Sequence, residues 1–172
     1  MMELLRYPDL RLRIANERLQ TYGPQEAEKV AQMFRIMAEA DGIALAAPQV
    51  GWNVRLFILS VPDPKSGEAV QKVIWNPRLE TMGPKIRMPE GCISFPGVRA
   101  EIERWTRARL TGMSPEGWID MILDGLFAQA AQHELDHLDS ILIIDRMTSS
   151  DYKANAAIIE ALERTVRERT RV

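Results

Sequence analysis

The sequence has little cysteine and histidine and no long apolar run. Cys92 is the only cysteine in 172 residues, which excludes an internal disulfide bond. No stretch approaches the roughly 18 apolar residues that a membrane-spanning helix needs. The opening MMELLRYPDLRLR lacks the apolar core of a secretory signal. These absences predict a cytoplasmic protein that does not cross a membrane.

An excess of charge of one sign is also missing. The formal net charge is -2, from 22 basic and 24 acidic residues in mixed order. A nucleic-acid-binding protein would show a basic stripe, and a membrane-surface protein a polybasic cluster. Apolar residues make up 46% of the chain, which is ordinary for a globular protein. We therefore expect one globular domain over residues 1–172 and no direct contact with nucleic acid.

Hydrophobic periodicity predicts helices toward both ends of the chain and strands between them. Apolar residues at three- and four-residue spacing predict amphipathic helices over residues 24–41, 125–139 and 150–169. Alternating or continuous apolar runs predict strands over residues 54–61, 70–79, 98–111, 117–123 and 141–145. The small-residue segment 42–51 is expected to be a loop. This order predicts an α+β fold, with mixed or antiparallel strands around the helix at 125–139.

That helix contains the pattern H-E-x-x-H, formed by His133, Glu134 and His137. Helix positions four residues apart share one face, so both imidazoles can reach one metal ion. Glu134 lies about 100° around the helix from His133, within reach of a water at that ion. The alternative is a buried helix whose histidines are hydrogen-bonded to neighbours. Because the chain has no other histidine, the pattern favours a metal site.

Cys92, in the segment EGCIS, is the first choice for a third metal ligand. A lone free cysteine is more often a small buried apolar residue. An open catalytic site needs three protein ligands, however, and no third histidine exists. The rival is a zinc peptidase that takes Glu160 or Glu163 from the last helix as its third ligand. That hypothesis leaves Cys92 unexplained.

Three segments resemble, in order, the signature motifs of the peptide deformylases. They are GIALAAPQ at 42–49, EGCIS at 90–94 and QHELDH at 132–137. The resemblance also includes YPDLRLR, WNPRLE and LIIDRM, and it extends to about Met147. It implies an enzyme that removes the formyl group from the N-terminal formyl-methionine of nascent polypeptides and releases formate.

The resemblance also implies how the site would work. One divalent ion, usually ferrous iron with zinc, nickel or cobalt as substitutes, would be held by Cys92, His133 and His137. It would polarise the formyl carbonyl and acidify a water molecule. Glu134 would take the water's proton and pass it to the departing amine. The Gln49 side chain and the Ile93 backbone N–H would donate to the formyl oxygen.

Further residues are carried over as supports of the site and as substrate contacts. Arg104 resembles an arginine that pairs with the motif glutamate, here Glu90, and Asp136 is expected to orient an imidazole. Arg99 resembles an arginine that contacts the substrate backbone. From the bare sequence, arginines at such positions are more often surface residues. The other residues expected along the substrate path are Gly42, Ile43, Ala44, Gly91, Leu126 and Gln129.

Three positions depart from the family pattern. Ala44 replaces a glycine and adds a methyl group beside the expected substrate path. Gln129 lies where an aliphatic residue is expected in a pocket for methionine, and Asp139 stands where glycine is common. Two alternatives therefore stay open: an altered side-chain preference, and a family member that has lost activity and acts as a binding module.

The expected partner is the N-formylated nascent peptide. We expect the last helix to pack on the domain through an apolar side. A contact with the ribosome or with a second subunit is the alternative for this helix. The sequence therefore leaves both a monomer and a homodimer open.

Overall fold

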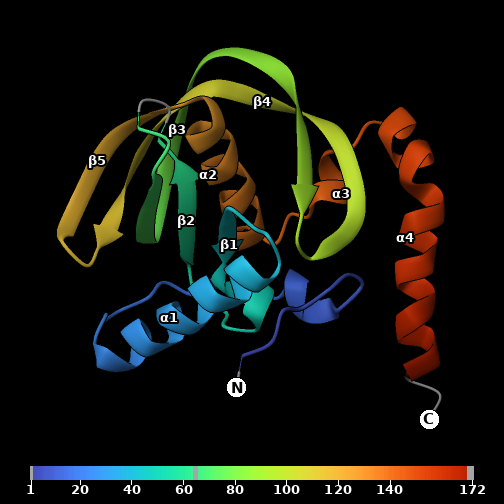
Figure 1. Cartoon of the computed structure of the whole chain (residues 1–172), viewed down its shortest axis with the longest axis horizontal. Helices are drawn as coiled ribbons and strands as arrows, with labels where there is room; N and C mark the ends of the chain where they lie inside the picture. Colours follow the sequence, from blue (N-terminus) through green and yellow to red (C-terminus); the bar gives the residue numbers. More distant parts are fainter. Residues whose placement is uncertain (1, 64–65, 170–172) are drawn as a thin grey trace.

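The computed structural model describes residues 2–63 and 66–169, without the side chains of 166–169. Figure 1 shows their arrangement. The described residues contain two 3-10 helices and four α-helices: η1 (Leu10–Arg13), η2 (Ala47–Val50), α1 (Pro24–Glu39), α2 (Gly125–Leu138), α3 (Ile143–Arg146) and α4 (Ser149–Arg169). The same part of the chain contains five strands: β1 (Ala44–Ala46), β2 (Leu56–Pro62), β3 (Ala69–Cys92), β4 (Phe95–Ser114) and β5 (Gly117–Asp124).

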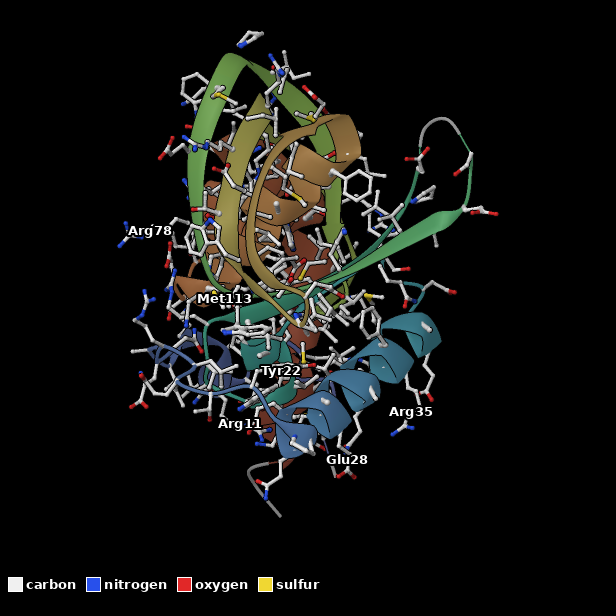
Figure 2. All side chains as sticks on the ribbon, turned by 90° about the vertical axis from the view of Figure 1, so that its left-hand side faces the viewer. Arg11, Tyr22, Glu28, Arg35, Arg78 and Met113 are labelled. Carbon is white, nitrogen blue, oxygen red and sulfur yellow. The ribbon has the colours of Figure 1, made fainter. Side chains whose placement is uncertain are left out.

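The five strands form one sheet in the order β1-β2-β3-β4-β5. Every pairing between them is antiparallel, so of the two predicted arrangements the antiparallel one is found. β3 and β4 form a long hairpin whose tight end lies at the pair Cys92 and Phe95. In Figures 1 and 2 the strands β3 to β5 curl around α2.

Helix α2 contacts all five strands of the sheet. Its first half is rich in alanine, and the small side chains of Ala128 and Ala131 are fully buried. They pack in one apolar cluster with Phe57, Ile74 and Leu110 from three strands. Close approach of helix and sheet therefore fixes the part of α2 from which His133 and His137 project.

Helix α1 lies at one end of the sheet. Pro24 opens it, as Pro commonly does at a first helical position. Val30 and Met37 on its inner side are buried, whereas Glu28 and Arg35 point away from the body in Figure 2. In the described part of the chain, no helix is both long and apolar enough to cross a membrane.

Two predicted boundaries were wrong, the end of the strand at 70–79 and the extent of the loop at 42–51. The strand predicted at 70–79 continues to Cys92, since a bulge after Trp75 absorbs Asn76 and the proline that follows. Asn76 adopts a positive φ of 50°, and its amide bonds both backbone groups of Leu19. The segment 42–51 is not only a loop, because it forms β1 and η2.

The strand predicted at 141–145 is also wrong, because these residues form the helical turn α3. The Asp145 carboxylate accepts the Leu142 N–H at 2.8 Å and thereby caps the turn. Arg13 holds the same carboxylate at 2.6 Å. Leu142 and Ile143 are buried in an apolar cluster, so their hydrophobicity reflects packing and not strand pairing.

Candidate metal centre and active site

Three side chains with metal-binding atoms meet between the end of β3 and helix α2. Cys92 ends the strand, and His133 and His137 lie one turn apart on the helix. Their ligand atoms are buried and all lie within 4.8 Å of one another. The His137 Nε2 is 3.3 Å from the Cys92 Sγ. A thiolate and two imidazoles form a donor set suited to zinc or iron rather than to calcium or magnesium.

Glu90 orients the first imidazole. The Nδ1 of His133 is 3.0 Å from the Glu90 Oε2, which leaves the Nε2 of that ring as its metal-binding atom. Arg104 donates to both oxygens of the same carboxylate, at 2.8 and 3.1 Å. Burial opposes ionisation of Glu90, but the bonds from His133 and Arg104 outweigh it and lower its pKa to about 2.

Arg104 also joins Glu90 to Asp136. Its Nη1 donates to Asp136 at 2.7 Å, and Arg146 donates to the two Asp136 oxygens at 2.6 and 3.1 Å. The predicted pairing of Arg104 with Glu90 is present. Asp136 does not bond an imidazole as expected: it acts on His133 through Arg104 and Glu90. Arg146, within the segment LIIDRM, is a support of the site that was not predicted from the sequence.

Glu134 is buried beside the cluster. Its Oε2 has no hydrogen-bond partner among the described residues. Burial raises its pKa to about 7, partly offset by the nearby His133. A carboxyl group with a pKa near the working pH can both accept and return a proton. Glu134 therefore has the properties of a general acid and base.

The amide of Gln49 is fixed at both ends. Its Oε1 accepts the Ala46 N–H at 2.8 Å, while its Nε2 donates to the Ser94 Oγ at 3.0 Å and lies 3.5 Å from the Cys92 Sγ. Gln49 thus bonds its own turn and also directs an N–H toward the cluster. Ile93 lies in the turn between Cys92 and Phe95. Ser94, within EGCIS, is a support of Gln49 that was not predicted from the sequence.

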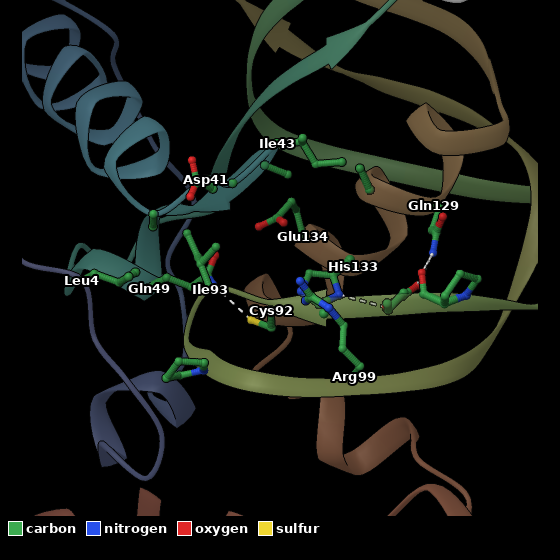
Figure 3. Close-up of a pocket in the computed structure, with 18 of the residues that line it drawn as sticks. Leu4, Asp41, Ile43, Gln49, Cys92, Ile93, Arg99, Gln129, His133 and Glu134 are labelled. Atoms are coloured by element: carbon green, nitrogen blue, oxygen red, sulfur yellow. Dashed lines mark hydrogen bonds and ion pairs between the residues drawn. The ribbon is translucent and has the colours of Figure 1, made fainter. Parts of the chain in front are cut away.

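A cavity of about 600 Å³ opens beside the cluster, and Figure 3 shows it. All the residues predicted along the substrate path line it: Gly42, Ile43, Ala44, Gly91, Arg99, Leu126 and Gln129. Glu90, Gln49, Ile93 and Glu134 also line it, whereas Arg104 and Asp136 do not. Leu4 and Arg6 of the N-terminal segment were not predicted as lining residues.

The glutamates of the rival peptidase hypothesis lie elsewhere. Glu163 accepts a hydrogen bond from the Tyr7 hydroxyl at 2.7 Å, and Glu160 lies 3.8 Å from Arg164 on the surface of α4. Within residues 2–63 and 66–169, the group of donors close enough for one ion contains neither of them. The geometry therefore favours Cys92 as the third ligand.

Comparison with known proteins gives one family. Residues 1–153 match the sequence profile of the polypeptide deformylases. The chain is 41% identical to peptide deformylase 2 of Streptomyces avermitilis over 134 residues, 77% of this chain and 72% of that protein. It is 36% identical to the chloroplastic/mitochondrial peptide deformylase 1B of Arabidopsis thaliana over 171 residues. That match covers 98% of this chain but 62% of the plant protein, less than two thirds of its length.

Solved structures agree with the sequence comparison. A mutant of Arabidopsis thaliana peptide deformylase 1B has a TM-score of 0.92 at 35% identity, covering 99% of this chain and 94% of the other. Peptide deformylase from Plasmodium falciparum has a TM-score of 0.90 at 32% identity, covering 96% of this chain and 98% of the other.

We predict that Cys92→Ala lowers the affinity for a divalent ion more than about 100-fold, because losing an outer partner alone costs roughly 10- to 100-fold. Titration with cobalt against a chelator measures the affinity, and circular dichroism checks the fold. Unchanged affinity in a folded variant would favour a ligand other than Cys92, such as the glutamate of a peptidase.

We predict that Glu90→Gln removes part of the acid sensitivity of the metal-free protein. The folded-state pKa of Glu90 is about 2, below its ordinary 4.5, so its ionised form stabilises the fold above about pH 4.5. That contribution, on the order of 3 kcal/mol, is lost as the pH falls toward 2. Urea unfolding measured between these pH values should show a shallower loss in the variant.

The control for this prediction is Glu103→Gln, whose exposed carboxylate pairs with Lys85. Exposed ion pairs contribute about 0 to 1 kcal/mol, so this variant should follow the wild type across the pH range. If the free energy of unfolding fell equally with falling pH in the wild type and in Glu90→Gln, the low pKa assigned to Glu90 would be contradicted.

Proposed function

The chain belongs to the polypeptide deformylase family, and on that premise we propose that it removes the formyl group from N-terminal formyl-methionine of nascent polypeptides. The observation that carries the proposal is the buried cluster of Cys92, His133 and His137, with Glu134 beside it, at a cavity of about 600 Å³. We propose that residues 1–172 act as one catalytic domain in the cytoplasm.

We propose that the three clustered donors hold one divalent ion. Ferrous iron is the proposed native ion, with zinc, nickel or cobalt as substitutes. The buried thiol of Cys92 supports a transition metal, because soft sulfur ligands discriminate against hard cations. When bound, such an ion supplies Lewis-acid chemistry, which polarises a carbonyl group and acidifies water.

Glu134 moves the proton in this proposal. It accepts the proton of the attacking water and gives it to the nitrogen that leaves with the peptide. Two observations support this role: a buried carboxylate oxygen without a partner among the described residues, and a pKa of about 7. With this pKa, Glu134 can both accept the proton from water and give it to the leaving nitrogen near neutral pH.

Gln49 and the backbone N–H of Ile93 stabilise the charge that develops on the formyl oxygen. The Gln49 amide needs little reorganisation, because Ala46 and Ser94 already hold it. Donors that are fixed before the reaction are worth more than mobile ones, typically about 3 to 4 kcal/mol each.

The cavity wall has apolar side chains that can contact the methionine side chain and polar groups that can contact the peptide backbone. The side chains of Ile43 and Leu126 are 39% and 46% exposed, and both line the cavity. Burying such surface against a methionine side chain is favourable. Arg99 lines the cavity as well and supplies donors for the peptide backbone.

A second candidate is a deformylase with a broader preference for the first residue. Gln129 lines the cavity, and its Nε2 donates to the Pro89 carbonyl at 2.9 Å, so one part of the wall is polar. Ala44, the other departure from the family pattern, also lines the cavity.

We predict that Gln129→Leu raises the preference for formyl-Met over formyl-Gln peptides by about 10-fold, because an apolar wall of similar volume penalises a buried polar side chain by roughly 1 to 3 kcal/mol. The ratio of kcat/KM for the two peptides measures this preference. An unchanged ratio would mean that Gln129 does not meet the first side chain.

We predict that the protein loaded with ferrous iron or nickel releases formate from formyl-Met-Ala-Ser under anaerobic conditions. Glu134→Ala should lower kcat by about 10²- to 10⁴-fold, the usual contribution of general acid–base catalysis, while the ion stays bound. A metal-loaded wild type that cleaves neither this peptide nor other formyl peptides would contradict the proposal and favour the binding module.

A contact of α4 with the ribosome or with a second subunit stays a prediction from the sequence. Monomer and homodimer both stay compatible with it. The expected partner in either case is the formylated nascent chain.

A further inference from the structure

Helix α4 faces the β3–β4 hairpin with one stripe of side chains. Asp151 pairs with Arg87 of β3 at 2.8 Å. One turn further, Asn155 is buried against β4, and Ile159 is buried in the apolar cluster of the hairpin. Glu163 then accepts the bond from Tyr7. The four-residue spacing places these contacts on one face of the helix.

Asn155 holds the backbone of Arg99 at two points. Its Oδ1 accepts the Arg99 N–H at 3.2 Å, and its Nδ2 donates to the Arg99 carbonyl at 2.8 Å. The pairing of β5 with β4 begins only at Arg107. The Asn155 amide therefore bonds backbone groups of Arg99 in the way that a neighbouring strand would. Asn155 is 6% exposed, so water competes little for these bonds.

The side chain of Arg99 crosses the neighbouring strand at a glycine. Arg99 and Gly91 are opposite each other in the β3–β4 register. A Cβ at Gly91 would lie 1.4 Å from the Arg99 Nη1, so no other residue would allow this path. Gly91 immediately precedes Cys92, and Figure 3 shows Arg99 extending from β4 into the cavity beside the cluster.

We propose that Asn155 is a positioning residue for substrate binding, acting through Arg99. An exposed arginine samples many rotamers, and fixing it costs entropy. Asn155 fixes the position of the Arg99 backbone. Because Gly91 has no Cβ, the Arg99 side chain has room to lie across β3. Helix α4 thus takes part in substrate affinity although none of its described side chains lines the cavity. This inference rests on the proposed deformylase function.

The test compares KM and kcat of nickel-loaded variants with formyl-Met-Ala-Ser. Asn155→Ala should raise KM about fivefold, the effect of losing an ordinary hydrogen bond, with kcat within about twofold of the wild type. Asn155→Asp keeps an acceptor for the Arg99 N–H but not a donor for its carbonyl. Its KM should therefore lie between the KM of the wild type and that of Asn155→Ala. In an Arg99→Ala background, Asn155→Ala should add no further effect on KM.

The matched control is Glu163→Ala, which removes another contact of the same stripe without touching Arg99. It should lower Tm and leave KM unchanged. Amide hydrogen exchange supplies a readout without turnover: the Arg99 amide should lose protection in Asn155→Ala and keep it in Asn155→Asp.

The outcomes separate the two proposals. An active wild type with an unchanged KM in Asn155→Ala, whatever its Tm, overturns the role of Asn155 and leaves the deformylase proposal standing. Equal KM increases in Asn155→Ala and Glu163→Ala would also overturn it, since any loosening of α4 would then suffice. A wild type that binds nickel but cleaves no formyl peptide overturns the proposed function and this inference with it.

Discussion

The buried ion pair between Arg104 and Glu90 is the contact on which the geometry of the site depends. Both side chains are about 5% exposed, and a charge buried at such a depth is costly unless each of its polar atoms has a partner. Arg104 finds these partners on two elements, Glu90 on β3 and Asp136 on α2. Because both carboxylates pair with the same guanidinium, the strand that ends in Cys92 is held against the helix that carries the two histidines.

The site contains two buried glutamates with opposite protonation behaviour. Glu90 accepts bonds from a guanidinium and an imidazole, and its pKa falls to about 2. Glu134 has an oxygen with no partner among the described residues, and burial raises its pKa to about 7. His133 lies next to both. One carboxylate can therefore serve as a permanent charge that orients the ring, while the other is free to exchange a proton.

Local patterns predicted the parts of the site that depend on local geometry. The four-residue spacing of His133 and His137 follows from the helical repeat, and the scarcity of other donors pointed to Cys92. The long extension of β3 was missed because Asn76 bonds to Leu19, 57 residues away. For the same reason neither Arg146 nor Asn155 stood out: their partners lie 10 and 56 positions from them in the sequence. Side chains of this kind are identified by the tertiary structure alone.

The separation of the three metal donors has a thermodynamic consequence. Cys92 and His137 are 45 positions apart and meet only when the hairpin and α2 have docked. An ion that binds this arrangement but not the unfolded chain draws the folding equilibrium toward the native state. At a free ion concentration of 100 times Kd, the gain is about 2.7 kcal/mol, a sizeable share of the stability of an ordinary domain. A bound ion would then raise the free energy of unfolding of the chain as well as complete the site.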